Sequence, residues 1–196
     1  MLNMTVGGIT CRISLLFPAV LLWMLLWDPT GYVLLGVTAA ILHEGGHLIA
    51  FIIFGKRPKT LTVSYYGMRM TYSADSAVGY AQEAFIAAAG PLMNLLCAGC
   101  LYCFGGSQAA CLLHIGLATV NLLPIVPLDG GCILLSLLRL LPLSDTTVVR
   151  LTTGISYGSF VGILLLSMAV YTHSGNMTMV LFALYVGLFI LFYKGN

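Results

Sequence analysis

Residues 31–54 form an apolar run in which Glu44 is the only residue with a charged side chain. If fully helical, this run would be about 36 Å long, enough to cross the hydrocarbon core of a bilayer, which is about 30 Å thick. Of all 196 residues, 60% are hydrophobic and 7% are charged, and the mean hydropathy is +1.02. A water-soluble domain of this length does not need so much apolar surface, so the sequence predicts a membrane protein.

The same run contains the sequence His-Glu-Gly-Gly-His at residues 43–47. His43 and His47 share one face of a helix, so both imidazoles can bind one metal ion. Glu44 lies beside them, where it can accept a proton from water at the metal without being a ligand. Each glycine of the pair costs about 1 kcal/mol in a helix relative to alanine, which suggests close packing of another helix here. The motif predicts a hydrolytic metal centre with Glu44 as the general base.

The distribution of apolar segments predicts an all-α polytopic membrane protein with six transmembrane helices in a single domain, residues 1–196. Residues 1–12 are short and mildly polar. The first run, residues 13–27, is interpreted as a span and not as a signal peptide, because no small-x-small cleavage site follows it. The six predicted spans are residues 13–27, 31–54, 81–104, 108–141, 151–171 and 177–193.

The fourth predicted span is too long for one straight crossing, and it is interrupted by Pro124 and Pro127. We interpret it as one discontinuous helix, broken near residues 123–128. Irregular backbone at membrane depth persists only where protein or a water-filled cavity satisfies it, so we expect a cavity at this break. After the second span, β-branched and aromatic residues on both sides of Gly67 predict a short β-hairpin over about residues 59–73.

The basic residues predict the orientation of the spans. With the N-terminus in the cytoplasm, all eight Lys and Arg residues fall on the cytoplasmic side of a six-span protein, and so does the C-terminus. A net charge of +2, with no basic cluster among aromatic residues, argues against binding of nucleic acid. The six cysteines lie mostly in apolar segments, which argues against a secreted disulfide framework.

Asp129 is the candidate for a third metal ligand. Measured from the cytoplasmic ends of their spans, Asp129 and His43 both lie about 17 Å deep along a helix. Two histidines and one carboxylate leave a position of a tetrahedral Zn²⁺ open for water, the pattern of a catalytic site. The alternative is that Asp129, which follows Pro127, is the N-cap of a helix.

Several other polar residues leave alternatives open. Asn94 and Asn121 could bind a substrate backbone or an oxyanion, or instead satisfy backbone groups freed by nearby prolines. We interpret His114, which shares a helical face with Asn121, as hydrogen-bonded to a neighbour and not as a ligand. Three cysteines of the third span are interpreted as packing residues because they lie in an apolar helix: Cys97, Cys100 and Cys103.

Three motifs in this order resemble the site-2 protease family of intramembrane zinc metalloproteases, peptidase M50. They are residues 43–47, the sequence Ala-Gly-Pro-Leu-Met-Asn at residues 89–94, and the interrupted segment at residues 121–131. The resemblance covers about residues 12–195 in the order of spans and is nearest to the sporulation branch of the family. That branch usually carries a nucleotide-sensing CBS domain after the sixth span, which we expect to be lacking here, as is the PDZ domain of other branches.

The resemblance implies one zinc ion per chain and an extended substrate that pairs with the hairpin after the motif helix. It also implies a place in a bacterial cell membrane. It assigns zinc binding to His43, His47 and Asp129, proton transfer to Glu44, and positions facing the cleft to Asn94 and Asn121.

Together these inferences predict a zinc-dependent intramembrane endopeptidase that cleaves a membrane-associated protein within or near its transmembrane segment. The expected partners are this protein substrate and the lipid bilayer. A membrane metal-transport protein is an alternative, although the paired repeats that it would favour are not visible. A di-iron oxygenase would need more histidines than the four present. A catalytically silent scaffold is a further alternative, against which the intact Glu44 and ligand set argue.

Overall fold

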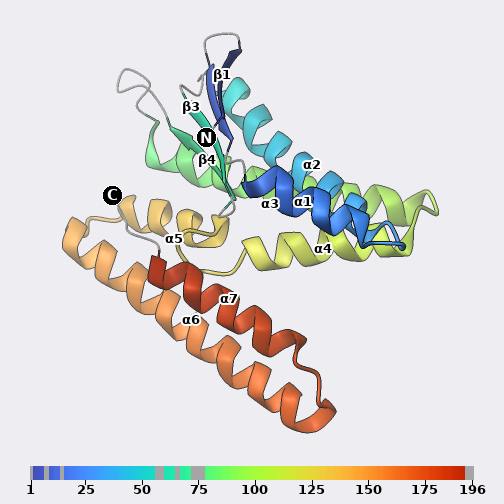
Figure 1. Ribbon diagram of the computed structural model, residues 1–196. Coiled ribbons are helices and arrows are strands. Elements are labelled where there is room, and N and C mark those ends of the chain that lie inside the picture. The colour runs from blue at the N-terminus through green and yellow to red at the C-terminus, as the bar shows by residue number, and fades with distance from the viewer. Residues whose placement is uncertain are drawn as a thin grey trace. The chain divides into compact units, whose positions relative to one another are not determined.

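The computed structural model describes residues 2–6, 9–13, 16–55, 60–64, 67–71 and 78–192. The chain divides into two compact units, Met1–Thr119 and Val120–Asn196. Helices make up most of the described residues in both units, as the predicted all-α class requires (Figure 1).

In the first unit, helix α2 (Tyr32–Ile53) packs against helix α3 (Tyr80–Cys103). Ala50, Phe51 and Ile86 are buried at the centre of this contact. A Cβ atom on Gly46 would lie 2.5 Å from the carbonyl oxygen of Ala89, so the absence of a side chain lets the two backbones approach here. A Cβ atom on the neighbouring Gly45 would meet nothing within 4 Å. The close packing suggested by the glycine pair therefore involves Gly46 alone.

Gly46→Ala and Gly45→Ala form a matched pair that tests this contact. We expect Gly46→Ala to lower the free energy of unfolding by about 1–3 kcal/mol, because the added methyl group overpacks the α2–α3 contact. Gly45→Ala should be neutral or stabilising by up to about 1 kcal/mol, because alanine is the better helix former. Thermal unfolding in detergent, followed by circular dichroism, compares the two variants. Equal effects would contradict the close approach at Gly46.

Helix α1 (Leu16–Leu26) precedes a polar turn that leads into α2. In this turn the Asp28 carboxylate accepts hydrogen bonds from the N–H groups of Thr30, at 3.0 Å, and Val33, at 2.6 Å, and from the Thr30 hydroxyl. The Thr30 hydroxyl and then the Val33 N–H hold the pKa of Asp28 below its usual value, because they stabilise the ionised form. Helix α2 then begins after Gly31, which has a φ of 75° that few other residues adopt.

Within the described residues, four strands form one sheet, in this order: β1 (Leu2–Val6), β2 (Ile9–Ile13), β3 (Thr60–Ser64) and β4 (Gly67–Thr71). β3 and β4 are antiparallel, with Thr60 opposite Thr71, at the place where the sequence predicts a hairpin. β1 and β2 form a second antiparallel pair, and β2 lies parallel to β3; neither pairing was predicted. Apolar and polar residues alternate on both sides of Gly7-Gly8, a hairpin signal that the sequence analysis missed.

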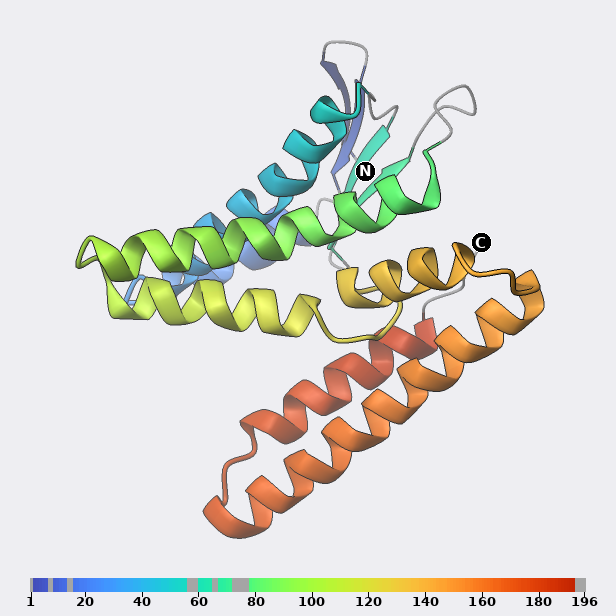
Figure 2. The same ribbon diagram turned by 180° about the vertical axis from the view of Figure 1, so that it is seen from behind.

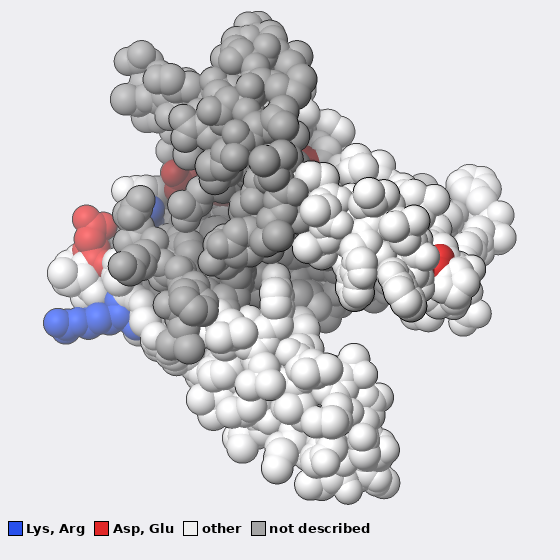
Figure 3. Space-filling model, viewed as in Figure 1, with Lys and Arg blue, Asp and Glu red and all other residues white. Residues whose placement is uncertain are grey.

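Three described helices are long and apolar enough to span a membrane: α2, α3 and α6 (Asp145–Ser174). The space-filling view shows few charged side chains on the described surface that faces the viewer (Figure 3). The other described helices have 11 to 15 residues and are therefore about 16–23 Å long, which is shorter than the bilayer core. The predicted count of six spans is not confirmed and stays a prediction.

In the second unit, α6 packs against both α5 (Asp129–Arg139) and α7 (Thr178–Phe192). Figures 1 and 2 both show α6 and α7 side by side and antiparallel. Helix α6 begins earlier than the predicted span at residue 151, because the hydroxyl of Ser144 caps it by accepting a hydrogen bond from the Thr147 N–H, at 3.3 Å.

The fourth predicted span is broken close to the predicted place. Helix α4 (Gln108–Asn121) ends before residues 122–128, and α5 begins after them. The buried hydroxyl of Ser156 on α6 accepts a hydrogen bond from the Val126 N–H, at 3.2 Å, and donates one to the Thr152 carbonyl, at 2.8 Å. Within the loop, the Leu128 N–H donates to the Ile125 carbonyl at 2.7 Å. Protein groups thus form hydrogen bonds with part of the irregular backbone of this loop. At membrane depth, such backbone groups must be hydrogen-bonded either by protein or by water in a cavity.

Candidate active site

His43 and His47 face each other on α2. Their Nε2 atoms lie 3.3 Å apart, and the rings meet edge to face with an interplanar angle of 84°. Two nitrogens that are each about 2.0–2.1 Å from one tetrahedral zinc ion are about 3.3 Å apart. The spacing of the two Nε2 atoms therefore fits two ligands of one zinc ion.

Gly90 on α3 provides the space next to these two nitrogens. A Cβ atom at this position would lie 2.3 Å from Nε2 of His47 and 2.8 Å from Nε2 of His43. Any larger residue would therefore occupy the space where both rings present their ligand atoms. Gly90, in the Ala-Gly-Pro-Leu-Met-Asn motif of α3, is therefore needed to leave room for His43 and His47 of α2.

The second ring nitrogen of His47 is held by the backbone of α3. Nδ1 lies 2.7 Å from the carbonyl oxygen of Ile86. Since a carbonyl oxygen can only accept, Nδ1 carries the proton and donates it, which leaves the lone pair of this neutral ring on Nε2. This is the tautomer and the anchoring contact that metal-binding histidines usually have.

Asn94 lies behind His43 and is completely buried. Its Nδ2 atom is 3.1 Å from Nδ1 of His43, and its Oδ1 atom is 3.0 Å from Nδ1 of His114 on α4. The prediction that His114 is hydrogen-bonded to a neighbour is confirmed, and the neighbour is Asn94. The amide of Asn94 contacts two imidazoles. This geometry favours a role in holding the His43 ring over a role in binding substrate.

Glu44 follows His43 on α2 and is half-buried. The residue thus follows a facing imidazole directly in the chain, and its side chain is only partly covered by protein. Its role as general base stays a prediction.

Asp129 and Asn121 belong to the second unit, and both are half-buried. Asp129 is the first residue of α5, and the N-cap is Leu128, so the alternative that Asp129 is the N-cap is wrong. The loop before α5 folds closely over its first turn. A Cβ atom on Gly130 would lie 2.2 Å from the carbonyl oxygen of Leu122, and one on Gly131 would lie 2.4 Å from the carbonyl carbon of Ile125.

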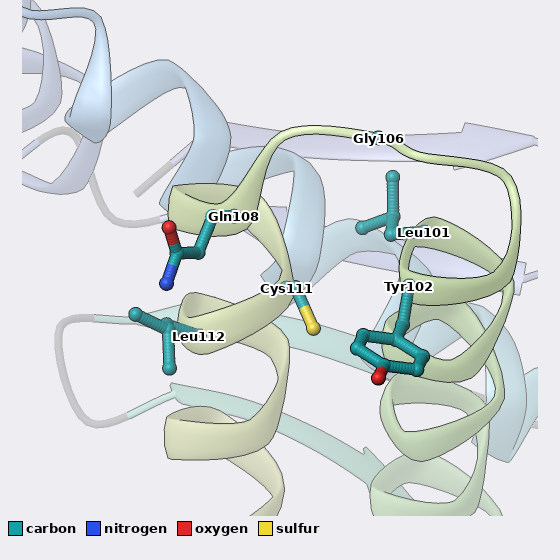
Figure 4. A pocket seen from close by; sticks show the side chains of 6 residues that line it. All are labelled: Leu101, Tyr102, Gly106, Gln108, Cys111 and Leu112. Carbon is teal, nitrogen blue, oxygen red and sulfur yellow. The ribbon is translucent and has the colours of Figure 1, made fainter.

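A hollow at the turn between α3 and α4 lies apart from the histidines. Tyr102, which lines it, is about 18 Å from Gly90 along α3, so the hollow is not part of this site. It is lined by residues from both helices and the turn (Figure 4): Leu101, Tyr102, Gly106, Gln108, Cys111 and Leu112.

Comparison with known proteins identifies the family. A sequence-family model described as Peptidase M50B-like matches residues 15–128, more than half of the chain. The chain belongs to the peptidase M50B-like family. The matched residues of this M50B-like chain include both histidines, Glu44 and Asn94, and they end immediately before Asp129.

The fold of this M50B-like chain is similar to that of a solved structure, the site-2 protease from Methanocaldococcus jannaschii. The two are 19% identical, with a TM-score of 0.66, and the comparison covers 100% of this chain and 97% of that chain. At this identity the likeness concerns the fold alone. No curated protein matches the chain by sequence.

Family membership and apolar helices together make the chain a membrane protease of the M50 type, a family that is zinc-dependent in general. Sequence analysis did not assign two residues of this M50B-like site, Gly90 and His114. The signal for Gly90 was its place in the motif at residues 89–94. The signal for His114 was a polar residue in an apolar helix. The sequence could not identify its hydrogen-bond partner, because that partner, Asn94, lies on another helix.

Proposed function

We propose that the chain is a zinc-dependent intramembrane endopeptidase that cleaves a membrane-associated protein within or near its transmembrane segment. The observation that carries this proposal is the pair of Nε2 atoms 3.3 Å apart, with Nδ1 of His47 anchored on the Ile86 carbonyl. Membership of the M50B-like family supports the same reaction. The proposed orientation keeps both termini in the cytoplasm, in a bacterial cell membrane.

We propose Asp129 as the third ligand. His43, His47 and Asp129 each offer a ligand atom of a kind that binds metal ions, a ring nitrogen or a carboxylate oxygen. Two imidazoles and one carboxylate suit Zn²⁺ and leave a fourth position for water, as in catalytic zinc sites. The close folding of the loop onto Gly130 and Gly131 supports a carboxylate held in a defined position.

The reaction is hydrolysis of a peptide bond. A zinc ion at these ligands supplies Lewis acidity that brings the pKa of water toward about 7. Glu44 accepts one proton from the attacking water, whose oxygen bonds to the peptide carbonyl carbon. When the C–N bond breaks, Glu44 returns that proton to the departing amine, and the carboxyl product keeps the added oxygen.

The substrate must reach this site in extended form, because a helical peptide bond is shielded and hydrogen-bonded. We propose that β4, which is an edge strand of the sheet, pairs with the substrate backbone. Asn121 stays a proposed contact for the substrate backbone or the oxyanion.

Asp129→Ala and Asp145→Ala test the third ligand as a matched pair, because each residue is the first residue of a helix. We expect Asp129→Ala to lose stoichiometric zinc and cleavage, since two histidines alone bind zinc weakly. Asp145→Ala should retain about one zinc ion per chain. Zinc is measured by elemental analysis of protein purified in detergent. Full zinc content in Asp129→Ala would exclude Asp129 as a ligand.

A further inference from the structure

Three helices of the first unit contribute to one buried row of polar side chains. His43 comes from α2, Asn94 from α3 and His114 from α4. The exposed fraction is 5% for each histidine and 0% for Asn94, and each hydrogen bond in the row is about 3 Å long. The reaction proposed above gives no role to His114. His114 is a buried polar residue that contacts Asn94, which in turn contacts the proposed metal ligand His43. Its presence there therefore needs an explanation.

The chemistry of His43 requires a particular partner. A neutral imidazole that binds a metal through Nε2 carries its proton on Nδ1, and that N–H needs an acceptor. For His47 the acceptor is the Ile86 carbonyl. For His43, the amide of Asn94 lies within hydrogen-bond distance of Nδ1, at 3.1 Å.

The amide of Asn94 has two orientations with opposite consequences. In the structure its NH₂ group faces His43 and its oxygen faces His114. In this orientation Asn94 donates to Nδ1 of His43, so the proton of that ring is on Nε2, which then cannot bind a metal. Turning the amide over lets its oxygen accept from the Nδ1–H of His43. Its NH₂ group then needs an acceptor at Nδ1 of His114.

We propose that His114 is a positioning residue for His43, which acts through Asn94 and supports the amide orientation in which His43 binds metal. A neutral histidine suits this place because its Nδ1 accepts a hydrogen bond in one tautomer and donates one in the other. His114 therefore satisfies Asn94 both with and without metal. The inference rests on the proposed metalloprotease function and adds a second residue, after Asn94, to the support of the His43 ring.

Zinc affinity of variants at His114 tests the proposal. Affinity is measured on the full chain in detergent by competition with a chromogenic chelator. We expect His114→Phe, which lacks ring nitrogens, to bind zinc about 10-fold more weakly, at the lower end of the range for outer-shell partners. His114→Asn places an amide atom where Nδ1 was and should restore most of the affinity. His114→Gln places its amide atoms near the former Nε2 and should not restore it.

The matched control is Cys111→Ala. The Cys111 thiol donates to the Ala98 carbonyl, at 3.5 Å, so this variant removes another hydrogen bond between α3 and α4 without touching Asn94. We expect its zinc affinity to equal that of the wild type.

The possible results separate this inference from the proposed function. A wild-type chain that binds no zinc contradicts both. Tight binding by the wild type together with unchanged affinity in His114→Phe contradicts the role of His114 alone. If His114→Phe does not fold, the comparison of His114→Asn with His114→Gln decides, and equal affinities would show that His114 only fills space.

Discussion

Replacing Glu44 by glutamine is expected to abolish cleavage while the chain keeps its zinc. Glutamine has nearly the same shape as glutamate but cannot accept the proton of the attacking water, and loss of a general base typically slows a reaction by about 10²–10⁴-fold. Since Glu44 is proposed as a base and not as a ligand, zinc content should stay at about one ion per chain. Co-expression with candidate single-span membrane proteins, followed by immunoblotting for the product, measures cleavage.

Glu83→Gln is the control for this experiment, because Glu83 is the other glutamate of the chain and lies in the first turn of α3. It should cleave like the wild type. A product that persists in Glu44→Gln would remove the proposed base from the mechanism. Loss of zinc in that variant would instead make Glu44 a ligand. Metal uptake into cells that is unchanged by Glu44→Gln and abolished by Asp129→Ala would favour a transporter.

Gly90→Ala is expected to eliminate zinc binding and, with it, cleavage. The added Cβ atom would lie under 3 Å from Nε2 of both histidines, so the rings must move apart or the helices must separate. We expect zinc affinity to fall by more than about 100-fold. This is a larger loss than mutation of a residue that hydrogen-bonds a metal ligand usually causes. Chelator competition and elemental analysis measure the change.

Gly99→Ala on the same helix is the matched control. A Cβ atom on Gly99 would meet nothing within 4 Å, so this variant tests the general effect of alanine in α3. It should bind zinc like the wild type and be slightly more stable. Wild-type zinc affinity in Gly90→Ala would contradict the arrangement of His43 and His47 around this position.

Local patterns predicted the elements whose information lies within a few residues. The spacing of His43 and His47 put both rings on one helix face, as the facing Nε2 atoms bear out. Prolines 124 and 127 predicted the break between α4 and α5 because proline cannot continue a helix. The β-branched and aromatic residues on both sides of Gly67 predicted a hairpin in the region where β3 and β4 lie antiparallel.

Contacts between distant segments could not be predicted in this way. The parallel pairing of β2 with β3 joins residues about 50 positions apart in the chain, and no local pattern encodes such a partner. The hydrogen bond between Asn94 and His114 likewise depends on how α3 and α4 pack. From the sequence we could note only that His114 and Asn121 share one face of a helix, which does not identify the partner of His114.

The sequence by itself determined the apolar, helical class of this chain, the motif proposed to carry its chemistry and the glycines and prolines that shape its backbone. Periodicity and local sterics act along a single segment, so they can be read from it. Only the tertiary structure decided which glycine makes room for the imidazoles and which groups hold their second nitrogens. Those answers depend on distances of a few ångströms between different helices, and such distances result from the packing of the whole unit.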